Sequence, residues 1–195
     1  PERVSSVTLL NGPAVSNFKW HALAKIWRMP ILGELFVMTN TRTATKKIIE
    51  RGSPRPYPEG WIDEMYDRAD RAATKAALQM YRRTDVIKFA GEVENNVRPY
   101  DIPALILWGA HDPYVNVKYA QDTKDRIFPS ARIRVFEDSG HWPHVDNSSE
   151  FNAEVLSFLK EQMHVDHEQT KIVSDDVDQQ KPTENHGPSS GTVAS

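Results

Sequence analysis

The chain has 195 residues, 39% of them hydrophobic, which allows one domain with a sizeable core. Its net charge of −3 excludes the basic surface with which proteins bind nucleic acid. The absence of cysteine excludes disulfides and thiolate metal sites. No apolar run approaches the roughly 18 residues that a membrane span needs, and no signal-peptide pattern is present, so we expect a cytoplasmic protein.

Residues 4–10 form an apolar, β-branched run that predicts a mostly buried strand, and Asn11, Gly12 and Pro13 end it as a turn. We expect residues 1–17 to form one strand of the core. Because a core strand this close to the first residue has no lead-in, we expect the chain to be a truncated piece of a longer protein.

Residues 18–84 predict a block of helices. Apolar residues at helical spacing indicate helices over about 20–27, 31–38 and 43–50, and a longer helix over 59–81. Three prolines between the third and the fourth helix interrupt the pattern. Several large side chains of this block either line an apolar pocket or pack the helices together, and we favour packing for each: Trp20, Trp27, Phe36, Met38 and Trp61.

Residues 85–163 alternate between helix and strand. Helices are predicted over 85–95, 115–127 and 149–163, and strands over 104–108 and 132–136. The continuous apolar run at 104–108 is typical of a parallel strand covered on both faces. Strands joined by helices through short connections indicate an α/β fold with a parallel sheet. Residues 164–195 hold few apolar residues and no aromatics, so we expect a disordered tail.

A polar motif follows each of these two strands. Asp112 stands in Trp108-Gly-Ala-His-Asp-Pro, and His141 stands in Ser139-Gly-His-Trp-Pro. Because parallel sheets place functional groups at the carboxyl ends of their strands, we expect Asp112 to accept a hydrogen bond from His141, which would act as a general base. The plainer interpretations are an aspartate that caps the next helix and a histidine on a surface loop. The spacing of one β–α–β unit favours the catalytic pair.

This combination resembles the C-terminal half of an α/β-hydrolase with a helical cap. In that family a nucleophile, an acid and a histidine follow one another along the chain. The resemblance implies that residues 1–17 and 85–163 belong to the hydrolase core, with parallel strands and flanking helices, and that residues 18–84 form the inserted cap. The Trp-Gly-x-x-Asp-Pro form and the helical cap are most similar to haloalkane dehalogenases, epoxide hydrolases and C–C hydrolases.

The nucleophile has no credible place in this sequence. Gly187-Pro-Ser189-Ser-Gly191 matches Gly-x-Ser-x-Gly in letters only, since no strand precedes it, no helix follows it, and it comes after His141. We therefore expect the nucleophile and the oxyanion hole to lie outside the chain, which alone would be inactive. Some relatives carry the acid after the preceding strand, but here that position is near Asn11, which cannot carry the charge.

The resemblance implies hydrolysis of a small, fairly apolar substrate without a cofactor. A serine nucleophile would imply an ester or C–C bond, and an aspartate nucleophile a carbon–halogen bond or an epoxide. Trp142, beside the histidine, is expected to contact the substrate. The alternatives are a non-catalytic ligand-binding or interaction module, which gives no reason to keep both Asp112 and His141, and a nonfunctional product of a split reading frame.

Other histidines receive lesser roles. We expect His111 and His144 to lie at the rim of the pocket or to be exposed. His164 and His167 are three residues apart, but they stand in the polar tail, and we expect no metal there.

Overall fold

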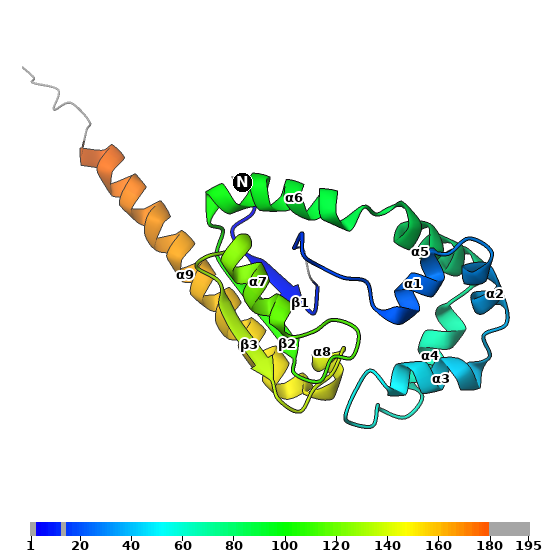
Figure 1. Ribbon diagram of the computed structural model, residues 1–195. Helices are drawn as coiled ribbons and strands as arrows, with labels where there is room; N and C mark the ends of the chain where they lie inside the picture. The colour runs from blue at the N-terminus through cyan, green and yellow to red at the C-terminus, as the bar shows by residue number, and fades with distance from the viewer. Residues whose placement is uncertain (1–2, 13–14, 180–195) are drawn as a thin grey trace, which may run out of the picture.

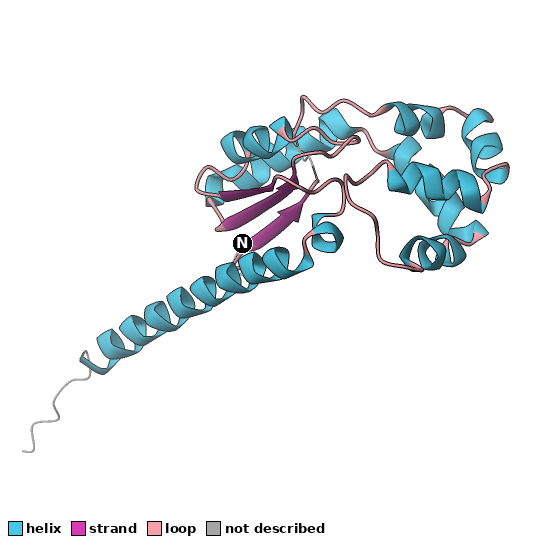
Figure 2. Ribbon diagram, turned by 90° about the horizontal axis from the view of Figure 1, so that it is seen from below, coloured by secondary structure: helices cyan, strands magenta, loops and turns pink. Residues whose placement is uncertain are grey.

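The structure is a computed structural model that describes residues 3–12 and 15–179. A three-stranded parallel sheet lies at its centre (Figures 1 and 2), with β1 (Val7–Leu10), β2 (Ala104–Gly109) and β3 (Arg132–Phe136) in that order. Leu9 pairs with Ile106, and Ile106 with Ile133. The parallel sheet with flanking helices confirms the predicted α/β class.

The central strand β2 is buried on both faces because helices cover each of them. Ile106 and Trp108 pack with residues of α6 (Val86–Val97) and α7 (Lys118–Arg126) on one face. Leu105 and Leu107 pack on the other face with Phe158 of α9 (Ser148–Gln179). Successive side chains along a strand point to opposite faces of the sheet. The single apolar run of β2 therefore contributes side chains to the hydrophobic cluster on each face.

The last helix runs further than predicted. The structure continues α9 beyond Met163 to Gln179, so the helix end predicted at residue 163 is wrong, while the disorder expected from residue 164 stays a prediction. The sequence between Met163 and Gln179 contains no glycine or proline, and a helix already nucleated by its packed first turns adds one hydrogen bond per residue. Residues 180–195 of that expectation lie outside the described residues.

Five helices make up the segment predicted to be the cap, and they lie beyond the carboxyl ends of the strands (Figures 1 and 2). They are α1 (Ala22–Arg28), α2 (Leu32–Met38), α3 (Arg42–Glu50), α4 (Trp61–Arg68) and α5 (Arg71–Arg83). The single helix predicted over 59–81 is wrong, because Asp70 breaks it. The Asp70 carboxylate accepts from the Ala73 N–H at 2.7 Å and caps a new helix.

Candidate active site

Asp112 and His141 meet at the carboxyl ends of β2 and β3. Asp112 Oδ2 lies 2.8 Å from His141 Nδ1. The Asp112 side chain is fully buried, whereas 28% of the His141 side chain is exposed. A carboxylate only accepts hydrogen bonds, so His141 Nδ1 carries the proton and Nε2 is left as the basic nitrogen.

The Asp112 carboxylate is held by further donors. Its Oδ1 accepts from the backbone N–H groups of Tyr114 at 2.8 Å and Val115 at 3.0 Å. Its Oδ2 also accepts from Asn11 Nδ2 at 2.7 Å. Both oxygens therefore have fixed directions, and the carboxylate holds the His141 ring in one orientation.

Asn11 is a site residue that the sequence analysis missed, because it considered this position only as a place for the acid. Its Nδ2 donates to Asp112 and, at 3.1 Å, to the Gly140 carbonyl, while its Oδ1 accepts from Gly109 N at 3.1 Å. One side chain thus joins the ends of all three strands. Its φ of 42° lies in the left-handed region, which asparagine adopts more readily than most residues, and this preference was the signal in the sequence.

Glycines allow the cap to approach the histidine loop closely. A Cβ on Gly140 would overlap the carbonyl oxygen of Gly52, and a Cβ on Gly109 would overlap that of Gly140. Gly52, which follows α3, also accepts a hydrogen bond from His141 N at 2.6 Å. The backbone of the proposed base is therefore bound directly to the cap.

A polar contact reinforces this connection. Asp146, at the end of α8 (Pro143–Asp146), accepts from Ser53 Oγ at 2.7 Å and from Gly140 N at 2.8 Å. Arg55 binds Asp138 at 3.0 Å on the same loop. We define the cap latch as Gly52, Ser53 and Asp146, which none of the sequence motifs indicated.

Aromatic rings surround His141. The Trp142 ring centroid lies 4.8 Å from that of His141 and 5.8 Å from each of the Tyr57 and Trp61 rings. The Tyr114 ring centroid lies 5.0 Å from that of His141 and 6.4 Å from that of Trp142. Burial raises the pKa of Tyr57 and of Tyr114, so both stay neutral at ordinary pH. Apart from the Asp112 carboxylate, the described groups around the base are uncharged rings.

The remaining candidates from the cap have other surroundings. Trp20 and Trp27 pack on Tyr81, with centroids 5.2 and 5.0 Å away. Phe36 is partly buried, and Met38 is 79% exposed. Only Trp61 of the predicted cap residues joins the described rings around His141.

The histidines expected at the rim of the pocket have different surroundings. His111 is exposed. His144 lies in α8, 5.8 Å from the Phe151 ring, and partial burial lowers its pKa. The described residues contain no cluster of three or more metal-ligating side chains. The side chains of His164 and His167, and the serine motif at 187–191, lie outside the described residues.

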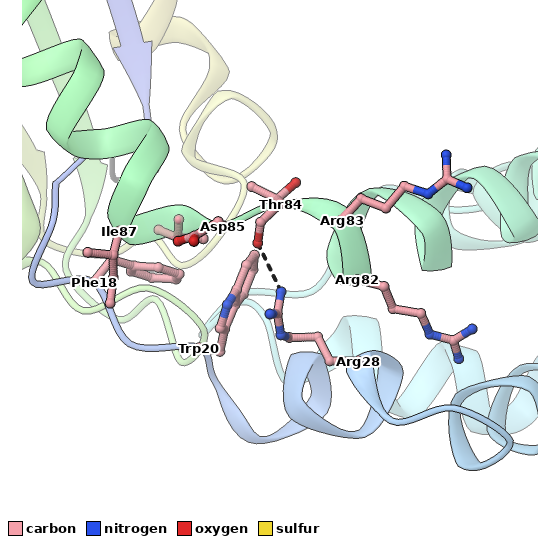
Figure 3. Close-up of a pocket in the computed structure, with 9 residues that line it drawn as sticks. Phe18, Trp20, Arg28, Arg82, Arg83, Thr84, Asp85 and Ile87 are labelled. Carbon is pink, nitrogen blue, oxygen red and sulfur yellow. Dashed lines mark hydrogen bonds between the residues drawn. The ribbon is translucent and has the colours of Figure 1, made fainter.

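A cavity of about 380 Å³ lies where the chain enters and leaves the cap (Figure 3). Phe18 and Trp20 line it from the entering segment, and Thr84 and Ile87 from the leaving segment. The Arg28 guanidinium lies 5.2 Å from the centre of the Trp20 ring and donates to the Thr84 carbonyl at 3.1 Å. Arg28 thus connects the segment that enters the cap with the segment that leaves it. Neither this cavity nor one of about 530 Å³ beside α3 and α4 is lined by Asp112 or His141.

Among the described residues, no helix combines the length and the apolar character that crossing a bilayer requires.

Comparisons with known proteins agree with this architecture. Residues 1–148 match the family model of the alpha/beta hydrolase fold. The sn-1-specific diacylglycerol lipase ABHD11 of Mus musculus is 38% identical over 61 residues, which cover 31% of this chain and 20% of the relative. Epoxide hydrolase 4 of Mus musculus is 31% identical over 64 residues, 33% of this chain and 18% of the relative.

Solved structures show the same fold at low identity. The 2-hydroxy-6-oxo-6-phenylhexa-2,4-dienoate hydrolase of Rhodococcus sp. strain RHA1 superposes with a TM-score of 0.65 at 14% identity, covering 82% of this chain and 57% of that one. The esterase EaEST of Exiguobacterium antarcticum gives 0.62 at 18% identity, covering 80% and 57%. The chain thus spans just over half of these structures, and its matched segments span about a fifth of the curated relatives.

Proposed function

This chain belongs to the α/β-hydrolase fold family, and we propose that it supplies the acid and the base of a hydrolase whose nucleophile lies outside residues 1–195. The contact between Asp112 and His141 carries the proposal. The two atoms are 2.8 Å apart, and the aspartate is fully withdrawn from water. Such an aspartate stabilises the imidazolium that forms when the histidine takes up a proton.

His141 Nε2 would act in one of two ways. With a serine nucleophile, Nε2 takes the hydroxyl proton as Oγ attacks the carbonyl carbon, and then returns this proton to the leaving group. With an aspartate nucleophile, the carboxylate displaces a halide or opens an epoxide and forms an ester. Nε2 then takes a proton from the water that attacks this ester.

The free edge of the sheet supports a nucleophile on a further strand. Among the described residues, β1 pairs with β2 only, so its other edge keeps unpaired backbone groups. Large apolar side chains are also exposed on the helices that cover the sheet, including Phe89 of α6 and Leu159 of α9. Exposed apolar surface of this kind is typical of a contact with another part of a protein.

The rings around His141 support a small, fairly apolar substrate. We assign Trp142 to the substrate contact, because its ring lies 4.8 Å from His141 and meets the cap rings of Tyr57 and Trp61. The similar proteins described above include a lipase, an esterase and an epoxide hydrolase. Ester and epoxide chemistry both fit the geometry of the base.

Replacing His141 in the full-length protein, in which the proposal places the nucleophile together with residues 1–195, tests the proposal. We expect His141→Gln to lower kcat at least about a hundredfold on the best substrate from a panel of short-chain esters, epoxides and haloalkanes. His111→Gln is the matched control, since this exposed histidine lies one residue before Asp112. Full activity of His141→Gln, or no turnover by the wild type, would contradict the proposal and favour a binding module.

The same variant separates the two nucleophiles. Attack by an aspartate does not need the histidine, so an ester intermediate should accumulate in His141→Gln and add the mass of the substrate fragment to the intact protein. Attack by a serine needs the histidine, so no adduct should accumulate. Intact-protein mass spectrometry after mixing with substrate makes this measurement.

A further inference from the structure

His21, at the start of the cap, is a second histidine near the catalytic pair. It precedes α1, and its Nδ1 accepts a hydrogen bond from Ala24 N at 3.2 Å, which caps the helix. Because Nδ1 is the acceptor, the neutral ring carries its proton on Nε2. Within the described part of the chain, no hydrogen bond engages Nε2.

The His21 ring shares a neighbour with the proposed base. Its centroid lies 5.3 Å from that of Tyr114, and the Tyr114 centroid lies 5.0 Å from that of His141. Burial lowers the pKa of His21, and the nearby His141 lowers it further, while Asp112 opposes the shift. His21 is therefore a neutral donor beside the reacting groups rather than a second cation.

Capping alone does not account for a histidine here. Asparagine, aspartate, serine and threonine are the preferred N-cap residues because their short side chains reach the first amide groups of the helix. Thr41, Asp70 and Asp85 take this part in α3, α5 and α6. Histidine differs from these residues in having a second ring nitrogen. Its Nε2 can donate a hydrogen bond while Nδ1 caps the helix.

We propose that His21 is a substrate-binding residue, whose Nε2–H donates a hydrogen bond to an uncharged oxygen or a halogen of the substrate. The acceptor belongs to a substrate held between the cap and the Asp112–His141 pair, so this inference rests on the proposed function. It adds a polar contact to the apolar rings of Trp142 and Trp61. The cap then selects substrates that carry an acceptor atom at this place.

Two variants of the full-length protein separate donation from capping. In His21→Asn, the amide oxygen can replace Nδ1 as the cap, but no group reaches the place of Nε2. In His21→Gln, the amide nitrogen reaches the place of Nε2, but the cap is lost. We expect His21→Asn to keep the wild-type Tm and to lower kcat/KM about tenfold, the value of one hydrogen bond. We expect His21→Gln to lower Tm and to keep kcat/KM within about threefold.

Other outcomes would overturn the inference. If His21→Asn keeps the wild-type kcat/KM, His21 serves only as a cap. If His21→Gln loses as much kcat/KM as His21→Asn, a donor at the place of Nε2 does not account for the loss, and the inference fails. A substrate analogue with a methylene group in place of the acceptor should be turned over equally by the wild type and His21→Asn, and an unequal rate would contradict the assigned contact. His141→Gln in the same assay distinguishes the two proposals. If His141→Gln loses turnover while His21→Asn keeps it, the proposed function stands and only the role of His21 is rejected.

Discussion

The hydrolase core and the cap differ in how they are held together. In the core, strand β2 is fully surrounded, and Leu105, Leu107 and Trp108 are each 0% exposed. In the cap, each helix has a single buried residue, and large apolar side chains such as Leu35 remain in contact with solvent. Directed polar contacts supply much of the attachment, among them the salt bridge from Arg82 of α5 to Glu34 of α2.

This difference matches the parts that the two regions play in the site. The core holds the acid through buried strand ends, where a shift of the backbone would cost packing energy in a close-packed interior. The cap supplies Trp61 and His21 on short helices and meets the base through the cap latch. A hydrolase can thus keep the geometry of acid and base while the cap varies with the substrate.

Matched leucine truncations test this comparison with the largest expected effect. Leu107→Ala removes a fully buried side chain from the core and should lower the free energy of unfolding by about 2–5 kcal/mol. Leu35→Ala makes the same change at a cap residue that is 51% exposed and should cost less than about 0.5 kcal/mol. Chemical denaturation of the full-length protein measures both. Equal losses would show that another part of the protein covers Leu35.

Replacing each of two glycines by alanine tests whether the close contact between the cap and the His141 loop contributes to stability and activity. Gly140→Ala should lower the free energy of unfolding by about 1–3 kcal/mol and reduce kcat, because the new Cβ meets the Gly52 backbone and pushes the His141 loop from the cap. Gly91→Ala is the control in α6, where a Cβ meets nothing within 4 Å. It should stabilise the helix by about 0.5–1 kcal/mol. Unchanged stability and kcat in Gly140→Ala would show that the loop and the cap do not need this contact.

The smallest expected effect is a pH dependence of the cap. The folded-state pKa of His21 is lowered by burial, so the unfolded chain takes up a proton at a higher pH than the folded chain. His21 therefore lowers stability as the pH falls from 7 to 5, by less than about 1 kcal/mol, since solvent screens the partly exposed ring. His21→Asn should show a smaller fall in Tm over this range. An identical fall in the variant would mean that His21 titrates alike in both states.

The local sequence pattern was sufficient to predict most elements and the positions of Asp112 and His141. The apolar run of β2 and the spacing of Asp112 and His141 predicted a parallel sheet with both residues at one edge, and the structure places them there. The pattern failed at Asp70, because apolar periodicity continues across a break that one capping side chain produces. It also misplaced the end of the last helix, because α9 continues past Met163 to Gln179 through residues without glycine or proline.

The remaining parts of the site depend on contacts between residues far apart in the chain. Asn11 is separated from Asp112 by 101 positions, and Gly52 accepts from His141 across the boundary between cap and core. Neither contact has a periodicity or a motif, because each arises only when the strand ends and the cap come together. Hydrophobic spacing and turn residues determine structure over a few neighbouring positions, so their effects can be predicted from the sequence alone. The partners of Asp112, the cap latch and the place of His21 beside Tyr114 were decided only by tertiary packing.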